Sequence, residues 1–353
     1  MLLPYWNRLG DVSQLESYPS SGIIHTSCRA MDMNTTLDVT LDDGRSVIVR
    51  QRHRYAFDPI FETWSTTKFQ SEIQLLRWLY VNSTIPVPKV LEVGSDFFIE
   101  EKMPGSTVAL LWHSWSKNAK ENFMSAYVDI VLELFRFSTP QRIGSVSTNA
   151  VEGSSILSVG PRIAPRASCS SPNTFDDVFE LFNFLVVVKR QTVEEMKPDD
   201  QERAKQVLSA IESKALSLLR GINDPLLLQC VLTHADLHNY NILVDDHGTI
   251  TAVLDWEINY IQPAILCADY PAWLSDEGPN DPDFAFRNYW WDESPTERRR
   301  LRSQFEEMVR ERNPNFYKCL TEGRDLRAIV AWFSDTNEDP GFERMASWAK
   351  SRL

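Results

Sequence analysis

The segment at 232–257, LTHADLHNYNILVDDHGTITAVLDWE, limits the possible folds more than any other part of the chain. Two short apolar stretches, 242–245 and 249–254, flank the sequence Asp-His-Gly. Apolar stretches joined by a short turn that contains Asp and Gly are typical of a β-hairpin. We therefore expect two antiparallel strands, with polar residues before the first strand and after the second.

Three oxygen-bearing side chains are expected at the open end of this hairpin. Counting outward from the turn places Asn241 opposite Asp255, where paired strands lie roughly 5 Å apart. An amide oxygen and a carboxylate suit a hard cation such as Mg²⁺. Asp236 precedes Asn241 on the loop that leads to the same end. Metal ligands beside a carboxylate that orients an attacking hydroxyl are what phosphoryl transfer requires.

The joint pattern is more specific than any single residue, because a lone Asp before a strand is usually a cap or turn residue. The order H-x-D-L-x-x-x-N, then Asp after an apolar strand, resembles the aminoglycoside phosphotransferase and choline kinase-like family, and most closely its filamentous-fungal subgroup. The stretches FQSEIQLLRWLYVNSTIPVPKVL, FFIEEKMPG, VFELFNFLV and DYPAWL extend the resemblance over most of residues 35–275. It implies a bilobal protein-kinase-like fold that uses ATP and Mg²⁺.

The resemblance also implies roles for individual residues of the motif. Asp236 corresponds to the catalytic aspartate, and Asn241 and Asp255 correspond to the Mg²⁺ ligands. His234 corresponds to the structural histidine that braces the loop. His238 is a second catalytic candidate near the acceptor hydroxyl, with membership of the loop's hydrogen-bond network as the alternative.

The expected nucleotide contacts come from the N-terminal part. A kinase-like N-lobe sets a basic side chain of its third strand against the ATP phosphates and pairs it with a helix glutamate. The resemblance gives these places to Arg50 and Glu72, and it places the adenine beside Glu101 and Met103. Alternatively, Arg50 is a solvated strand-end residue and Glu72 an exposed helix residue. The segment 24–43 contains no glycine, although phosphate-binding loops usually need glycine for close backbone approach.

Acidic and aromatic residues after the motif are candidates for acceptor binding, because the corresponding region of the family helps to build the acceptor pocket. Aromatic walls with carboxylates suit a cationic or polyhydroxyl acceptor. We select Glu257 and Asp269 as acceptor-binding residues, although Asp269 could instead cap a helix. Tyr289, Trp290 and Trp291 either line the far edge of the pocket or pack in the core.

The predicted elements indicate an α+β fold class with two lobes. The antiparallel sheet and one helix of the small, nucleotide-binding N-lobe occupy 1–104, and the larger, mainly helical C-lobe occupies 105–353. Alternation around Asp43-Gly44 predicts a hairpin. Helical periodicity and capping signals predict helices at 65–81, at 118–137, at 175–189, after a capping box formed by Asp199 and Glu202, and after Pro295. The segment 139–174 is expected to be a loop around one short hairpin.

Composition limits the partners. With 36 basic and 49 acidic residues the formal net charge is −13, which disfavours nucleic acid, since phosphate binding needs a basic face. Five cysteines without a CxxC pair argue against a disulfide framework or a structural zinc site. The sequence shows no signal peptide and no apolar run that would span a membrane. We therefore expect a cytoplasmic protein whose partner is a small-molecule acceptor, with no nucleic-acid or membrane partner.

Three functions are compatible with these observations. The first is an ATP-dependent phosphotransferase that phosphorylates a hydroxyl of a small metabolite or antibiotic-like acceptor. The second is a nucleotide-binding pseudokinase, for which the glycine-free segment is the motive. The third is a kinase-like fold used for non-phosphoryl acid–base chemistry, in which the pair of metal ligands would have no purpose.

Overall fold

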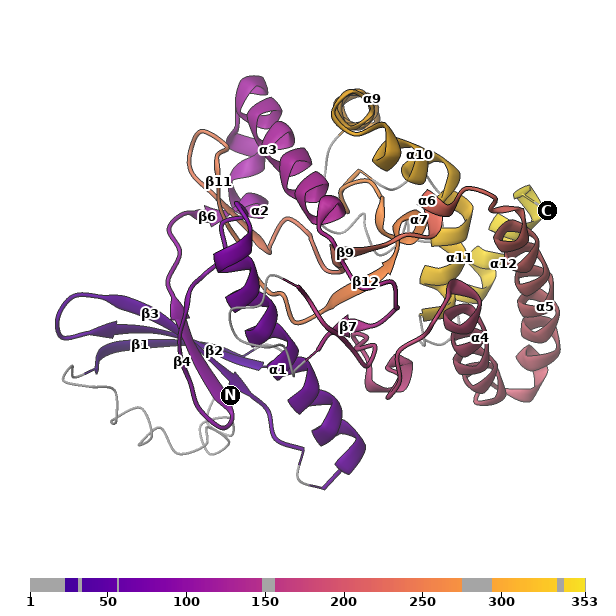
Figure 1. Ribbon diagram of the computed structural model, residues 1–353, viewed down its shortest axis with the longest axis horizontal. Coiled ribbons are helices and arrows are strands. Elements are labelled where there is room, and N and C mark those ends of the chain that lie inside the picture. Colours follow the sequence, from indigo (N-terminus) through magenta and orange to yellow (C-terminus); the bar gives the residue numbers. More distant parts are fainter. Residues whose placement is uncertain are drawn as a thin grey trace. The chain divides into compact units, whose positions relative to one another are not determined.

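The computed structural model describes residues 23–30, 34–55, 57–147, 156–274, 294–334 and 340–352. Its fold class is the expected α+β class, with a small sheet-rich N-terminal part and a larger, mainly helical part (Figure 1). Contacts between Cα atoms divide the chain into two units. The first runs to Arg54 and includes Pro88–Lys102, and the second comprises Tyr55–Val87 and Met103–Leu353. The lobe boundary after residue 104 stays a prediction.

The first unit is one antiparallel sheet of five strands in the order β1-β2-β3-β5-β4. The strands are β1 (Ile23–Ala30), β2 (Asn34–Leu41), β3 (Ser46–Arg52), β4 (Val90–Val93) and β5 (Phe97–Glu101). β2 and β3 form the predicted hairpin around Asp43-Gly44. Alternate residues of this sheet share one buried apolar cluster, made of Leu37, Val39, Leu41, Val47, Val49 and Ile99. The two-residue alternation of the sequence therefore indicated the buried face correctly.

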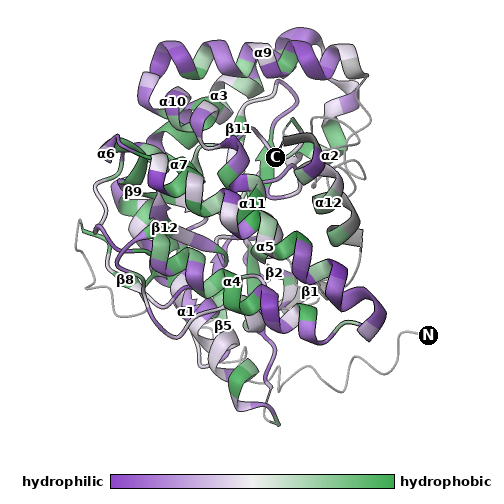
Figure 2. Ribbon diagram, turned by 90° about the vertical axis from the view of Figure 1, so that its right-hand side faces the viewer, coloured by the Kyte–Doolittle hydropathy of each residue, from purple (hydrophilic) through white to green (hydrophobic). Residues whose placement is uncertain are grey.

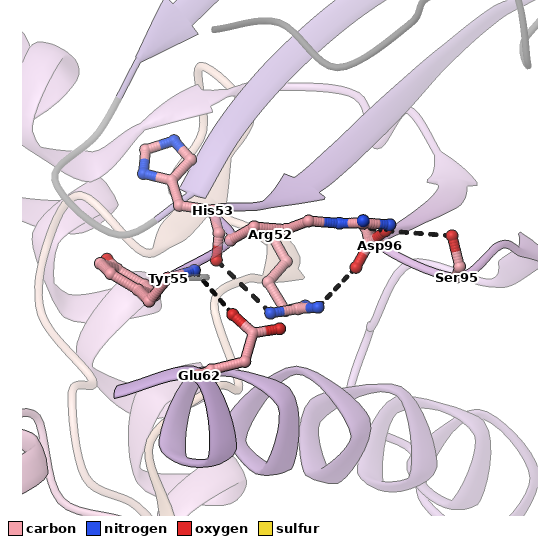
Figure 3. A network of polar contacts seen from close by, with 7 residues as sticks. Arg52, His53, Tyr55, Glu62, Ser95 and Asp96 are labelled. Atoms are coloured by element: carbon pink, nitrogen blue, oxygen red, sulfur yellow. Dashed lines mark hydrogen bonds and ion pairs between the residues drawn. The ribbon is translucent and has the colours of Figure 1, made fainter. Parts of the chain in front are cut away.

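A charged cluster lies beside the end of β3 (Figure 3). Buried Arg52 donates to Oδ1 of Asp96 at 2.5 Å, and Nε of Arg54 donates to Oδ2 of the same carboxylate at 2.7 Å. The hydroxyl of Ser95 donates to Asp96 as well. Although partial burial acts in the opposite direction, these hydrogen bonds and the charge of Arg52 lower the pKa of Asp96. Asp96 is an ionised structural acid.

The second unit begins with the 24-residue helix α1 (Pro59–Asn82). Asp58 caps the helix by accepting hydrogen bonds from two backbone N–H groups of the first turn, and a proline occupies the first helical position. Because of these signals the helix begins at Pro59. Periodicity had predicted the shorter range 65–81. Ahead of the helix, the backbone N–H of Tyr55 donates to Glu62 at 2.6 Å (Figure 3).

The described part of the second unit contains seven further helices of nine or more residues. They are α3 (Lys117–Arg136), α4 (Val178–Glu194), α5 (Pro198–Gly221), α9 (Pro295–Arg312), α10 (Pro314–Glu322), α11 (Arg324–Ser334) and α12 (Pro340–Arg352). Shorter helical segments are α2 (Val108–Leu111), η3 (Trp112–Ser114), η4 (Ala167–Cys169), α6 (Pro225–Leu228) and α7 (Ala264–Cys267). Figure 1 shows α4, α5, α11 and α12 as one packed group. The predicted helices at 118–137 and 175–189 correspond to α3 and α4.

The start of α5 differs from the prediction. Asp199 lies inside the first helical turn, because Pro198 already occupies the first helical position. The cap residue is Lys197, whose side chain makes no capping hydrogen bond. The predicted capping box of Asp199 with Glu202 is therefore wrong. Asp199 still suits its place, since an acidic side chain interacts favourably with the N-terminal end of a helix.

Helix α9 shows how the charged C-terminal helices pack. It is drawn as a mostly hydrophilic ribbon in Figure 2. The apolar residues Leu301, Phe305 and Val309 are fully buried and recur every fourth position, which is the spacing of one helical face. Across the described ranges, every helix is either too short or too polar to cross a bilayer.

Three small antiparallel sheets complete the second unit. The first has the order β11-β10-β6, the second pairs β12 with β9, and the third pairs β7 with β8. Their strands are β6 (Ser106–Thr107), β7 (Ser145–Val146), β8 (Val159–Gly160), β9 (Cys230–His234), β10 (Ile242–Val244), β11 (Ile250–Val253) and β12 (Asn259–Pro263). The β7–β8 pair is the short hairpin expected within 139–174, of which residues 148–155 lie outside the described ranges. β10 and β11 form the hairpin expected within 232–257.

The tip of the β10–β11 hairpin packs against α3. Gly248 has φ +83°, and a Cβ atom there would lie 2.5 Å from the backbone oxygen of Ala119. Only glycine combines that backbone conformation with so close an approach. Gly248 therefore fixes the hairpin, and with it the residues at its open end, against a long helix.

Candidate active site

His234, at the end of β9, braces the loop that carries Asp236. Its Nδ1 accepts a hydrogen bond from the backbone N–H of Asp236 at 3.1 Å, and its Nε2 lies 2.9 Å from the backbone oxygen of Leu254. The first contact requires an unprotonated Nδ1, so Nε2 carries the proton and donates to Leu254. Burial lowers the pKa of His234 to about 4, which keeps the ring neutral near pH 7. His234 thus makes the contacts expected of a structural histidine.

Asp236 lies on the loop after β9, with 49% of its side-chain surface exposed. The Nδ2 group of Asn241 donates to the backbone oxygen of Asp236 at 2.9 Å and approaches its Oδ2 at 3.4 Å. Burial on the protein side and the charges of Asp255 and Glu257 raise the pKa of Asp236 to about 6, against the opposing effects of His238 and Asn241. The loop therefore presents a basic carboxylate with one side open to solvent.

The register of the hairpin differs from the prediction by one residue. Asn241 accepts a hydrogen bond from the backbone N–H of Leu254 at 2.8 Å, so it pairs with Leu254 and not with Asp255. An irregularity between Leu243 and Val244 shifts the pairing by one residue within the hairpin. Asp255 comes one position later, with φ +63°, the only left-handed non-glycine residue in the described ranges. Because a left-handed residue reverses the chain direction locally, Asp255 remains close enough to Asp236 to raise its pKa.

Asn241 and Asp255 fit the Mg²⁺ ion that the sequence implies. Because the Nδ2 group of Asn241 is engaged by Asp236, its Oδ1 is the atom that would coordinate a cation. Asp255 adds a carboxylate, and hard oxygen donors are what Mg²⁺ requires. The described residues contain no group of three or more His, Cys, Asp or Glu with metal-binding geometry. A site of one amide and one carboxylate would therefore be completed by phosphate oxygens and water.

His238 contacts both Asp236 and Asn241. Its Nδ1 accepts from the backbone N–H of Tyr240 at 3.1 Å, while its Nε2 lies 3.6 Å from Oδ1 of Asp236 and 3.5 Å from Nδ2 of Asn241. With Nδ1 acting as an acceptor, Nε2 is the protonated nitrogen of the neutral ring. His238 therefore belongs to the loop's hydrogen-bond network, and its catalytic role stays a prediction.

Glu257 has a partner that the sequence did not reveal. Nζ of Lys68, on α1, lies 2.9 Å from Oε1 of Glu257. Only 3% of the Lys68 side chain and 15% of the Glu257 side chain are exposed. One signal could have found Lys68, since it is spaced four residues from both Trp64 and Glu72 on α1 and therefore shares their buried face.

Asp269 makes a different kind of contact. Its carboxylate lies 3.5 Å from Nε of Arg327, a buried residue of α11, and it accepts a hydrogen bond from the backbone N–H of Tyr270 at 2.8 Å. Arg327 also donates to backbone oxygens of the α7 and α10 segments. These contacts support a structural role, and acceptor binding by Asp269 stays a prediction. Tyr289, Trp290 and Trp291 lie outside the described residues.

The residues predicted to bind the nucleotide have clear local environments. Arg50 is half-buried within β3, with its guanidinium 6.0 Å from the ring centroid of Phe98. Glu72 is only 1% exposed, so the alternative of an exposed helix residue is wrong. Glu101 is exposed at the end of β5 and Met103 is half-buried, and the two contact units meet in sequence between residues 102 and 103. Their nucleotide contacts stay predictions.

Comparison with known proteins defines the class of the fold. The structure resembles that of aminoglycoside phosphotransferase APH(4)-Ia in complex with AMP-PNP and hygromycin B, with a TM-score of 0.56 at 15% identity over 96% of this chain and 95% of that one. It also resembles ADP-bound aminoglycoside phosphotransferase APH(2'')-Ib, with a TM-score of 0.51 at 14% identity over 92% and 96% of the two chains. The fold is therefore the protein-kinase-like fold of these phosphotransferases.

The sequence comparisons identify the family. Residues 172–269 match the phosphotransferase enzyme family. The chain is also 38% identical to the Clavilactone A biosynthesis cluster protein Y of Ampulloclitocybe clavipes, over 99% of this chain and 95% of that protein. The chain belongs to the aminoglycoside phosphotransferase-like family of phosphotransferase enzymes.

Proposed function

We propose that the protein transfers the γ-phosphate of ATP to a hydroxyl group of a small-molecule acceptor. The observation that carries the proposal is the contact of Asn241 with Asp236, which uses the amide nitrogen of Asn241 and so leaves its amide oxygen available for a cation beside the proposed catalytic carboxylate. Membership of the phosphotransferase family supports the same chemistry. Solved members of similar fold were crystallised with AMP-PNP or ADP, which supports ATP as the donor.

Asp236 is proposed to orient the acceptor hydroxyl and to receive its proton as the oxygen attacks phosphorus. Its open side makes it accessible to an acceptor, and its raised pKa makes it a better proton acceptor than an ordinary aspartate. Asn241 and Asp255 are proposed to hold Mg²⁺, which when bound would offset the charge of the phosphates. Arg50, Glu72, Glu101 and Met103 are proposed nucleotide contacts, as the resemblance implies.

The acceptor is proposed to be a polar small molecule. In addition to Asp236, the residues proposed to face it are Glu257, Asp269 and His238. A cluster of carboxylates favours an acceptor with hydroxyl or amino groups. A cytoplasmic location is part of the same proposal, and it is supported by the free thiols of the four cysteines in the described ranges, Cys169, Cys230, Cys267 and Cys319.

The test is a search for the phosphorylated product. The protein is incubated with ATP, Mg²⁺ and a metabolite extract, and mass spectrometry identifies any compound that gains a phosphate group. We expect at least one such compound with the wild type and none with Asp236→Asn. Binding of ATP and Mg²⁺ in a thermal-shift titration without any transfer would favour the pseudokinase instead, for which the glycine-free segment 24–43 is the motive. Chemistry that persists in EDTA without nucleotide would favour the non-phosphoryl alternative.

A further inference from the structure

Glu257, the partner of Lys68, is close in sequence to the proposed metal ligand Asp255. Glu257 follows Asp255 by two residues, and its charge contributes to the raised pKa of Asp236. Lys68 reaches this carboxylate from α1, and the two residues are separated by 189 positions in the sequence. The contact therefore depends on the tertiary fold and not on local sequence.

Lys68 is held on more than one side. Its Nζ lies 4.8 Å from the ring centroid of Trp64, which is the geometry of a cation–π contact. The indole N–H of Trp64 in turn donates to the backbone oxygen of Ala164 at 3.1 Å. Because a buried ammonium group is costly without a partner, the carboxylate of Glu257 is the group that makes this position tolerable for lysine.

Buried hydrogen bonds also join α1 to the segment that contains Glu257. Nδ2 of Asn259, which is fully buried, donates to the hydroxyl of Ser71 on α1 at 3.2 Å and to the backbone oxygen of Trp256 at 3.0 Å. Oδ1 of Asn259 accepts from the backbone N–H of Val146 at 2.9 Å. Lys68 thus reaches Glu257 from a helix that is also hydrogen-bonded, through Ser71, to Asn259 in the same segment.

We propose that Lys68 is a positioning residue that holds the Glu257 carboxylate toward α1 and so keeps it from serving as a ligand of the divalent ion. A carboxylate two residues beyond a metal ligand is a natural competitor for the same ion, because carboxylate oxygens bind hard cations readily. With Glu257 neutralised by Lys68, the ion is left to Asn241 and Asp255. The inference rests on the proposed function only in taking these two residues as the metal ligands.

The experiment measures divalent-ion binding, so that it does not depend on turnover. Mn²⁺ is titrated into the full-length protein with a saturating non-hydrolysable ATP analogue, and free Mn²⁺ is followed by electron paramagnetic resonance. The variants are Lys68→Met, Glu257→Gln and the double variant. Lys120→Met serves as the matched control, because Nζ of Lys120 lies 4.7 Å from the ring centroid of Trp112 but on a different helix, α3.

The three variants should change the Mn²⁺ dissociation constant in a signed pattern. Lys68→Met frees a carboxylate and should tighten Mn²⁺ binding roughly fivefold, the size expected for one unit charge uncovered several ångströms from the ion in a partly solvated site. Glu257→Gln removes a negative charge and should weaken binding slightly. The double variant and Lys120→Met should bind Mn²⁺ as the wild type does. The double variant also guards against poor folding of Lys68→Met, since it leaves no unpaired buried charge.

The outcomes separate this inference from the proposed function. If Lys68→Met leaves Mn²⁺ affinity unchanged, or changes it in the same direction as Glu257→Gln, Lys68 has only a structural role and the inference is wrong, whatever the enzyme does. If the variants change Mn²⁺ affinity in the expected pattern but the wild type phosphorylates nothing, the proposed function fails and the Lys68 inference stands. A wild type that binds no Mn²⁺ overturns both.

Discussion

Two acidic residues in different regions of the molecule, Asp96 and Asp236, have opposite pKa shifts because their surroundings differ. Asp96 receives hydrogen bonds from Arg52, Arg54 and Ser95, which lower its pKa despite partial burial. Asp236 is raised in pKa by burial and by neighbouring carboxylates, and only an amide and an imidazole oppose the effect. The first acid is placed to be stable when ionised, and the second is placed to be reactive.

The difference teaches that the candidate site holds its charges at a cost to stability. Asp255 and Glu257 act on Asp236 as like charges, and Lys68 pairs with one of them, Glu257. Such an arrangement is favourable only when a cation completes it. Replacing Asp236 should therefore impair function but not stability, whereas replacing Asp96 should impair stability but not function.

The largest expected effect is on turnover in Asp236→Asn. Loss of the proton-accepting carboxylate should lower kcat by about 10²–10⁴-fold, the contribution typical of a general base. Nucleotide binding measured by thermal shift should remain, and the protein should unfold at a temperature no lower than the wild type. Asp246→Asn, which changes an exposed residue of the hairpin turn, is the matched control and should retain kcat. Normal turnover in Asp236→Asn would remove the catalytic assignment.

The next effect is on metal affinity in Asp255→Asn. Asparagine tolerates the left-handed backbone at this position, so the fold should persist while a charged ligand is lost. We expect the Mg²⁺ concentration for half-maximal activity to rise at least about tenfold, since even residues that only support a metal ligand matter that much. Isothermal titration with Mn²⁺ checks the result directly. Unchanged metal affinity would exclude Asp255 as a ligand.

Asp96→Asn should act on stability and not on the metal. Removing this carboxylate takes away a charged hydrogen-bonding partner of Arg52, whose side chain is only 6% exposed, which should lower the free energy of unfolding by about 3 kcal/mol. Chemical denaturation followed by circular dichroism measures the loss. Asp43→Asn, which breaks the exposed pair of Asp43 with Arg45, should cause no measurable change. A stable Asp96→Asn variant would contradict the structural role.

The smallest effect is a pH dependence of opposite sign at the two acids. Because the folded protein binds the Asp236 proton more tightly than the unfolded chain does, the ionised residue destabilises the metal-free protein as pH rises from about 4 through about 6. Asp96, with its lowered pKa, instead contributes stability above its ordinary pKa and loses it as pH falls below that value. The two acids therefore change the free energy of unfolding in opposite directions as pH rises.

The measurement is urea unfolding without divalent ions at pH 4.5 and pH 7.5. The stability of Asp236→Asn relative to the wild type should be higher at pH 7.5 than at pH 4.5, and Mg²⁺ with nucleotide should remove that gain. The relative stability of Asp96→Asn should not improve with pH. A gain for Asp236→Asn that is the same at both pH values would show that charge is not its cause.

Much of the site could be predicted because its parts are close in sequence. His234, Asp236, Asn241 and Asp255 lie on one loop and one hairpin, and a short turn with Gly248 determines that the hairpin forms. The same reasoning failed by one residue in the register, because counting outward from a turn does not determine the pairing at the far end of a hairpin that contains an irregularity, here between Leu243 and Val244. It also misplaced the start of α5, where a proline overrides a capping pattern.

The sequence by itself predicted the fold class, since hydrophobic periodicity and turn chemistry act over a few neighbouring residues. The resemblance of its motif to known phosphotransferases indicated the family. Only the tertiary structure decided which distant groups meet that motif. Lys68 pairs with Glu257 across 189 positions, and Ser71 joins Asn259 across 188. From the sequence alone, a lysine in a helix is expected to be solvated. Its burial and its charged partner arise only when separate segments pack together.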